Sequence, residues 1–157
     1  MQIYQRLCDF GSSSLFLQQH LEFSKLHCKH TTMLKNILIV ALGGSIGSVA
    51  RFLVSKLNLY ISFFSIPIGT LTVNIAGSFI IGFLTGISDK STLLSAEWRL
   101  FLMVGICGGF TTFSSFTNEN LVLMHNGQLL PILLYTGLSI FLGFIAVYLG
   151  YSTSNLL

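Results

Sequence analysis

The chain has 157 residues, of which 52% are hydrophobic and only 8% are charged, and its mean hydropathy is +0.78. An ordinary soluble domain has about 25% charged residues, so eight Lys/Arg and five Asp/Glu are too few to cover a water-facing surface of this size. The net charge of +3 is small and the basic residues form no run, which excludes a nucleic-acid-binding surface. The composition therefore predicts an integral membrane protein whose surface meets the lipid bilayer.

Long stretches without charge divide the chain into predicted transmembrane helices. No charged residue lies between Lys56 and Asp89, between Arg99 and Glu119, or after Glu119. A helix needs roughly 20 apolar residues to cross the bilayer core. The resulting prediction is an all-α membrane protein with four spans, at residues 36–57, 66–87, 98–124 and 129–150. Because the connections are short, we expect neighbouring helices to run antiparallel.

The N-terminal residues 1–32 differ from the rest of the chain. They are polar, hold three of the four histidines, and lack the apolar core and cleavage site of a signal peptide. Met33 is followed at once by the first span. We therefore expect residues 1–32 to be a disordered extension or a mis-assigned start, residues 33–152 to form the membrane domain, and residues 153–157 to form a short tail.

Polar side chains recur at helical spacing inside two of the apolar spans. Thr70, Asn74 and Ser78 form a stripe on the second span, and Tyr135 and Ser139 form one on the fourth. Lipid offers no hydrogen bonds, so an amide in the middle of a span must find a protein partner or line a wet cavity. Asn74 is the strongest candidate for such a site.

The first span carries a similar stripe, which contains Arg51. Gly44, Ser48 and Ser55 share its face. A guanidinium near a span end can reach the membrane surface along its flexible stem. The shared stripe favours a position facing protein, where Arg51 attracts an anion or satisfies main-chain carbonyls. The glycine pairs of the first and second spans predict close helix packing.

The third span is interrupted by the run Gly108–Ser115, which reads GGFTTFSS. A non-helical turn at membrane depth is tolerated only inside protein or beside a water-filled path. It places helix ends and free main-chain groups where they can bind ions. A continuous helix bent by Ser and Thr side chains is the alternative, but it explains the paired glycines poorly. Phe113 and Phe116 follow one turn apart, a spacing that also suits lipid-facing or core residues.

Three ordered segments resemble the signatures of one family, the Fluc (also called CrcB) fluoride channels. They are residues 43–51 (GGSIGSVAR), 69–77 (GTLTVNIAG) and 105–116 (GICGGFTTFSSF). The resemblance covers residues 33–152 and departs from the third motif only at Ser115, where Thr is commoner. It implies an antiparallel, dual-topology homodimer with a broken third helix, placed in the inner (plasma) membrane, which exports fluoride passively.

The resemblance also assigns roles to residues. With Thr70 added from the second-span stripe, the expected fluoride pore consists of Asn74, Phe113, Phe116, Ser139, Tyr135 and Thr70. Fluoride is small and tightly hydrated, so a pore must replace its water with N–H and O–H donors and with the positive edges of aromatic rings. The carbonyls of Gly108 and Thr111 are expected to hold a structural Na⁺ at the dimer interface. Gly108 suits this role because unwound backbone often takes a positive φ.

Two other functions compete with the fluoride channel. A small proton-coupled exporter of the multidrug type needs a membrane-embedded carboxylate in its first span. The first span here has Arg51 and no acid, and the lone candidate is Glu119 in the third. A non-transporting anchor would explain the glycine faces but not a mid-span Asn74 beside an interrupted helix. The sequence has no nucleophile–base pair and no nucleotide-binding loop, so we expect no enzyme activity.

Overall fold

The computed structural model describes residues 32–56, 62–63, 65–90 and 94–156. Residues 1–31, nearly all of the expected extension, lie outside the described residues. The chain divides into two compact units, residues 1–38 and residues 39–157. In the first unit the described residues are helical. The second unit holds every contact and cavity considered below.

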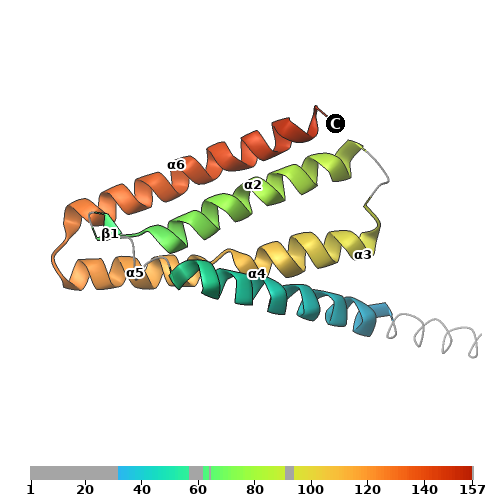
Figure 1. Cartoon of the computed structure of the whole chain (residues 1–157), viewed down its shortest axis with the longest axis horizontal. Coiled ribbons are helices and arrows are strands. Elements are labelled where there is room, and N and C mark those ends of the chain that lie inside the picture. Colours follow the sequence, from blue (N-terminus) through green and yellow to red (C-terminus); the bar gives the residue numbers. More distant parts are fainter. Residues whose placement is uncertain (1–31, 57–61, 64, 91–93, 157) are drawn as a thin grey trace, which may run out of the picture. The chain divides into compact units, whose positions relative to one another are not determined.

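Among the described residues, four helices are long and apolar enough to cross a membrane. They cover Thr32–Ser55, Ile68–Lys90 (α2), Ala96–His125 and Leu129–Ser154 (α6), and α2 and α6 lie side by side (Figure 1). The third is composed of α3 (Ala96–Arg99), the π-helix η2 (Leu100–Cys107), α4 (Gly108–Phe110) and α5 (Phe113–His125). The four predicted spans are confirmed, and their ends differ by about one helical turn at most.

Two residues with extended backbone separate α4 from α5. Thr111 has φ −75° and ψ 154°, and Thr112 has φ −149° and ψ 118°. The Thr112 hydroxyl accepts the N–H of Ser115 at 3.1 Å, which caps the first turn of α5.

The paired glycines before this segment are helical. Gly108 has φ −64° and ψ −36°, so the expectation of a positive φ at this residue is wrong. Gly109 allows close packing instead: a Cβ atom there would lie 2.5 Å from the main-chain oxygen of Gly44 on the first helix. Close approach to another helix, rather than unusual backbone geometry, therefore explains why residue 109 is a glycine.

Other glycines bring the helices together in the same way. A Cβ atom on Gly43 would lie 2.5 Å from the main-chain oxygen of Phe101, and Gly47 also faces the main chain of the third span. Gly82 of α2 faces the main chain of Val147 of α6. Small residues let helix backbones approach closely where lipid gives no hydrophobic drive. The prediction that these glycine pairs serve helix packing is confirmed.

A short antiparallel hairpin precedes α2. Its strands are β1 (Ser62–Phe63) and β2 (Ile66–Pro67), with Phe63 opposite Ile66. Ile66 is buried in a small core with Leu71, Leu123 and Tyr135, so the hairpin fixes the entry of α2. The sequence did not predict these strands because two residues are too few to show an alternating pattern.

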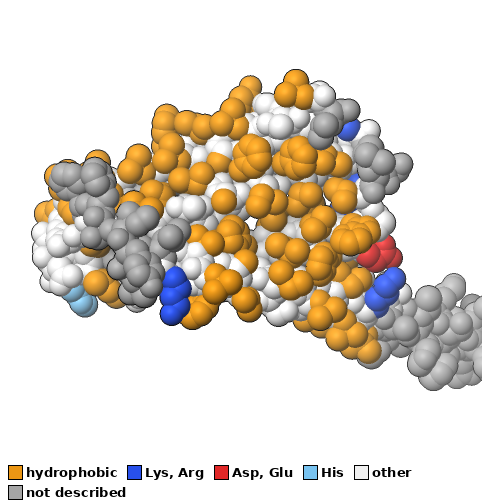
Figure 2. Space-filling view, in the orientation of Figure 1, with side chains coloured by type: hydrophobic (Ala, Val, Ile, Leu, Met, Phe, Trp, Pro, Cys, Tyr) orange, Lys and Arg blue, Asp and Glu red, His pale blue; other side chains and the backbone are white. Residues whose placement is uncertain are grey.

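The surface of the described chain is strongly apolar. Figure 2 shows hydrophobic side chains over most of the visible face and few charged ones. On α6, Leu133, Phe141, Phe144 and Tyr148 are among the most exposed side chains. Exposed apolar surface of this extent marks contact with lipid or with another protein. It agrees with the expected membrane environment.

Candidate functional site

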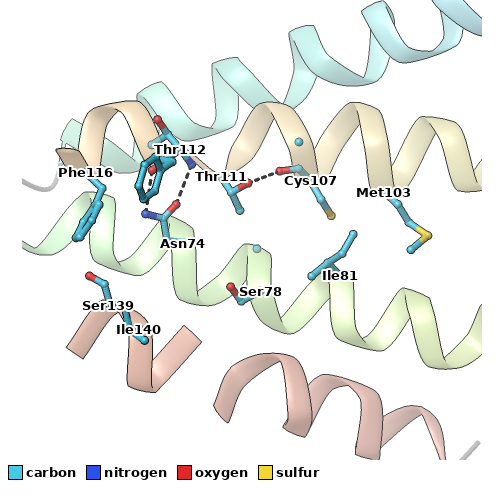
Figure 3. Close-up of a pocket in the computed structure, with 13 residues that line it drawn as sticks. Asn74, Ser78, Ile81, Met103, Cys107, Thr111, Thr112, Phe116, Ser139 and Ile140 are labelled. Atoms are coloured by element: carbon cyan, nitrogen blue, oxygen red, sulfur yellow. Dashed lines mark hydrogen bonds between the residues drawn. The ribbon is translucent and has the colours of Figure 1, made fainter. Parts of the chain in front are cut away.

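A cavity of about 440 Å³ lies where α2, the third span and α6 meet (Figure 3). Its polar and aromatic lining residues are Asn74, Ser78, Thr111, Thr112, Phe113, Phe116 and Ser139. The structure thus brings together four residues of the expected pore: Asn74, Phe113, Phe116 and Ser139. Gly108 and Thr111, the expected cation ligands, line the same cavity.

Asn74 is bound to the main chain of Thr112 by both ends of its side chain. The Thr112 N–H donates to Oδ1 of Asn74 at 2.8 Å, and Nδ2 of Asn74 donates to the Thr112 carbonyl at 3.1 Å (Figure 3). An amide nitrogen carries two hydrogens, so one N–H of Asn74 is left for the cavity that it lines. The amide therefore finds a protein partner and also lines the cavity.

Two carbonyls near this contact lose the donors that a continuous helix would give them. The N–H of residue i normally reaches the carbonyl of residue i−4. Here the Thr112 N–H goes to Asn74 instead of the Gly108 carbonyl. The Ser115 N–H goes to the Thr112 hydroxyl instead of the Thr111 carbonyl. These are the same two carbonyls that the resemblance assigned to a cation.

The two phenylalanines stand close to each other at the start of α5. The ring centroids of Phe113 and Phe116 are 5.8 Å apart, with 38° between the ring planes. Phe116 also packs on Tyr135, with 5.0 Å between centroids. Phe113 is 77% exposed in the single chain. Its ring can therefore contact a neighbouring molecule as well as the cavity.

Ser139 places a hydroxyl without a protein partner at the cavity. Its Oγ atom is buried and makes no hydrogen bond to any described residue. A buried polar group left unsatisfied costs about 1–3 kcal/mol. A water molecule or an anion in the cavity would satisfy this hydroxyl, so its position suits a ligand-binding role.

A second cavity, of about 300 Å³, lies between the first helix, α2 and α5. Its polar lining residues are Ser48, Arg51, Ser55, Thr70, Thr112, Ser115 and Glu119. Arg51 and Thr70, both expected in or near the pore, line this second cavity and not the first. Arg51 is half-buried and faces protein, as its stripe predicted. Thr112 lines both cavities, so the two cavities adjoin at this residue.

Glu119 joins two of the expected pore residues, although it was not itself among them. The Thr70 hydroxyl donates to Oε1 of Glu119 at 2.6 Å, and the Tyr135 hydroxyl donates to Oε2 at 2.7 Å. Thr70 and Tyr135 are both almost fully buried. Their hydroxyl protons are engaged by the carboxylate, so in this arrangement neither is available to an anion. One sequence signal existed: Glu119 is the only acidic residue after Arg99.

Within the described part of the chain, four membrane-length helices define a multi-pass membrane protein, and three of them (α2, the third span and α6) line a cavity with both polar and apolar side chains. Residues 38–151 match the family described as CrcB-like protein, Camphor Resistance (CrcB), and the chain belongs to this family.

Several relatives are named "Fluoride-specific ion channel FluC". The chain is 46% identical to that of Azobacteroides pseudotrichonymphae over 119 residues, which cover 76% of this chain and 95% of the relative. It is 42% identical to that of Flavobacterium psychrophilum over 118 residues, covering 74% and 94%. It is 47% identical to that of Chlorobium chlorochromatii over 115 residues, covering 73% and 88%. The resemblance found in the sequence is confirmed.

Proposed function

We propose that this chain forms a fluoride-specific ion channel of the inner (plasma) membrane, which lowers cytoplasmic fluoride by passive export and catalyses no reaction. The observation that carries the proposal is the first cavity. There the free N–H of Asn74, the unpartnered hydroxyl of Ser139 and the rings of Phe113 and Phe116 converge. The names of the relatives support the same function.

The donor set of this cavity suits conduction of an anion rather than its capture. Amide and hydroxyl groups replace hydration water, and ring edges add a weak positive potential. Several weak sites let an ion enter and leave. Arg51 supplies a positive charge to the second cavity, which the carboxylate of Glu119 also lines. Because Thr112 borders both cavities, the proposed path runs from the Arg51 cavity past Thr112 to the phenylalanines.

The proposed assembly is an antiparallel homodimer whose subunits insert in both orientations. The exposed ring of Phe113 and the apolar surface of the single chain support a second copy as partner. Orientation follows the Lys/Arg bias of short loops. Within the membrane domain, the N-terminal side carries Lys35, Lys90 and Arg99, and the other side carries Arg51 and Lys56. Three against two is almost no bias, which dual topology requires.

A structural Na⁺ at the dimer interface completes the proposal. A hard cation prefers oxygen ligands, and the carbonyls of Gly108 and Thr111 have their helical donors engaged elsewhere. When bound, the ion would hold the two third spans together. We predict that replacing Na⁺ by N-methyl-D-glucamine lowers the thermal stability of the purified dimer. An unchanged melting temperature, down to trace Na⁺, would count against this site.

Efflux from proteoliposomes distinguishes this function from the proton-coupled exporter. The exporter has one observation in its favour, the half-buried carboxylate of Glu119, which accepts hydrogen bonds from Thr70 and Tyr135. We expect a fluoride gradient to dissipate at the same rate with and without an opposing proton gradient, as recorded with a fluoride electrode. A strict requirement for the proton gradient would favour the exporter.

A further inference from the structure

The Asn74 side chain makes two hydrogen bonds to the protein main chain, although donating to an anion would require only one free N–H. Its side chain pairs with both the N–H and the carbonyl of Thr112, much as a neighbouring strand would. Among the described residues, no other α2 side chain hydrogen-bonds to Thr111 or Thr112. The amide of Asn74 is therefore the polar link between α2 and the extended segment.

This link matters for local structure because Thr112 lies at membrane depth. A buried main-chain group without a partner costs about 1–3 kcal/mol, and away from the two cavities that Thr112 lines only protein can supply a partner. The Thr112 N–H has two alternative acceptors: Oδ1 of Asn74, or the Gly108 carbonyl if the helix becomes continuous. Removing the Asn74 acceptor leaves either the second arrangement or an amide that no protein group protects and that water in the cavities can reach.

The consequences reach the start of α5. Thr112 caps α5 through its contact with Ser115, so the direction of this helix depends on the backbone of Thr112. Phe113 and Phe116 lie in the first turn of α5 and take their orientation from it. A continuous helix would rotate both rings and would return the Gly108 carbonyl to helical bonding.

We propose that Asn74 is a positioning residue, whose side chain holds Thr111 and Thr112 extended and thereby sets the places of the two phenylalanines. The inference rests on the proposed function and deepens it, since it adds a second role to any contact that Asn74 makes with fluoride.

Backbone NMR of the full-length protein in fluoride-free micelles tests the positioning role directly. The readouts are amide exchange at Thr112 and the 13Cα shifts of Thr111 and Thr112. Asn74→Leu removes donor and acceptor at similar volume. We expect Thr112 exchange to rise about tenfold or more, as for one lost hydrogen bond, or the 13Cα shifts to move to helical values. Asn74→Ala, which cannot clash, should give the same result if the leucine variant misfolds.

Two variants serve as comparisons. Asn74→Asp keeps an oxygen that can accept from the Thr112 N–H, so it should retain most of the protection and the extended shifts. Ser78→Ala changes the same cavity one turn further along α2 and has no hydrogen bond to the segment, so exchange at Thr112 should be unchanged. Amides in the middle of α6 report whether each variant is folded.

Two results would overturn the positioning role. One is unchanged exchange and unchanged shifts in folded Asn74→Leu and Asn74→Ala, even with fluoride efflux abolished; Asn74 would then be a donor only. The other is that Asn74→Asp loses protection as fully as Asn74→Leu. If wild-type protein passes no fluoride but the variants show the expected changes, the positioning role is supported and the proposed channel function fails.

Discussion

Adding a single methyl group at Gly43 should destabilise the packing between the first helix and the third span. A Cβ atom at this position would lie 2.5 Å from the main-chain oxygen of Phe101 and 2.9 Å from Cα of Gly105. Ordinary contacts begin near 3.4 Å. Both neighbours are backbone atoms, which cannot swing aside as the end of a side chain can. The two helices must therefore separate by about 1 Å.

The expected cost follows from this separation. Overpacking of a well-packed interface costs about 1–3 kcal/mol. The shift also weakens the nearby close contacts of Gly47 and Gly109, which lie on the same helix interface. We therefore expect Gly43→Ala to lower the melting temperature of the purified protein by several degrees.

The adjacent glycine provides a matched control. A Cβ atom on Gly44 would meet only the main-chain oxygen of Gly105, at 3.9 Å, which is an ordinary contact. Alanine is favoured over glycine inside a helix by about 1 kcal/mol. Gly44→Ala should therefore be as stable as the wild type or slightly more stable. Equal melting temperatures for Gly43→Ala and Gly44→Ala would refute this account of the helix interface.

Three further predictions concern the pore, the Glu119 contact and the topology. Phe113→Ile keeps an apolar side chain but removes the ring edge, so proteoliposomes should lose most fluoride efflux while the protein still assembles; wild-type efflux would remove Phe113 from the path. Tyr135→Phe leaves one oxygen of Glu119 without its donor and should cost about 1 kcal/mol in an unfolding titration, and an unchanged unfolding free energy would contradict this. A C-terminal topology reporter should show both orientations for protein starting at Met33 and mainly one for the longer chain, whose first 32 residues add three basic residues to the N-terminal side. A single fixed orientation of the shorter chain would exclude the antiparallel dimer.

The sequence predicted the transmembrane helices well because each helix that crosses the bilayer is one continuous stretch of mostly apolar residues. Charges cannot lie in the bilayer core at low cost, so the stretches without charge between Lys56 and Asp89, between Arg99 and Glu119 and after Glu119 marked the last three helices. Helical spacing also placed Asn74 and its stripe on the interior side of α2. Both predictions depend on order along the chain, which a sequence contains.

The contacts between helices were not predictable in the same way. Spacing along one helix does not say which side chain on another will meet it. Thr70, Glu119 and Tyr135 come from α2, α5 and α6, and only folding shows that one carboxylate engages both hydroxyls. The role of Gly109 was missed for the same reason, because its partner, Gly44, lies on the first helix.

The most direct test of the central claim compares fluoride and chloride efflux from proteoliposomes that contain the purified wild-type chain. A second, otherwise identical batch of proteoliposomes should contain the variant Asn74→Asp, which places a negative charge in the donor-lined cavity. Repulsion of roughly 4 kcal/mol at close range would slow fluoride by orders of magnitude. We predict rapid fluoride efflux, little chloride efflux, and loss of fluoride efflux in the variant. Equal efflux of the two anions, or wild-type efflux in Asn74→Asp, would contradict the account.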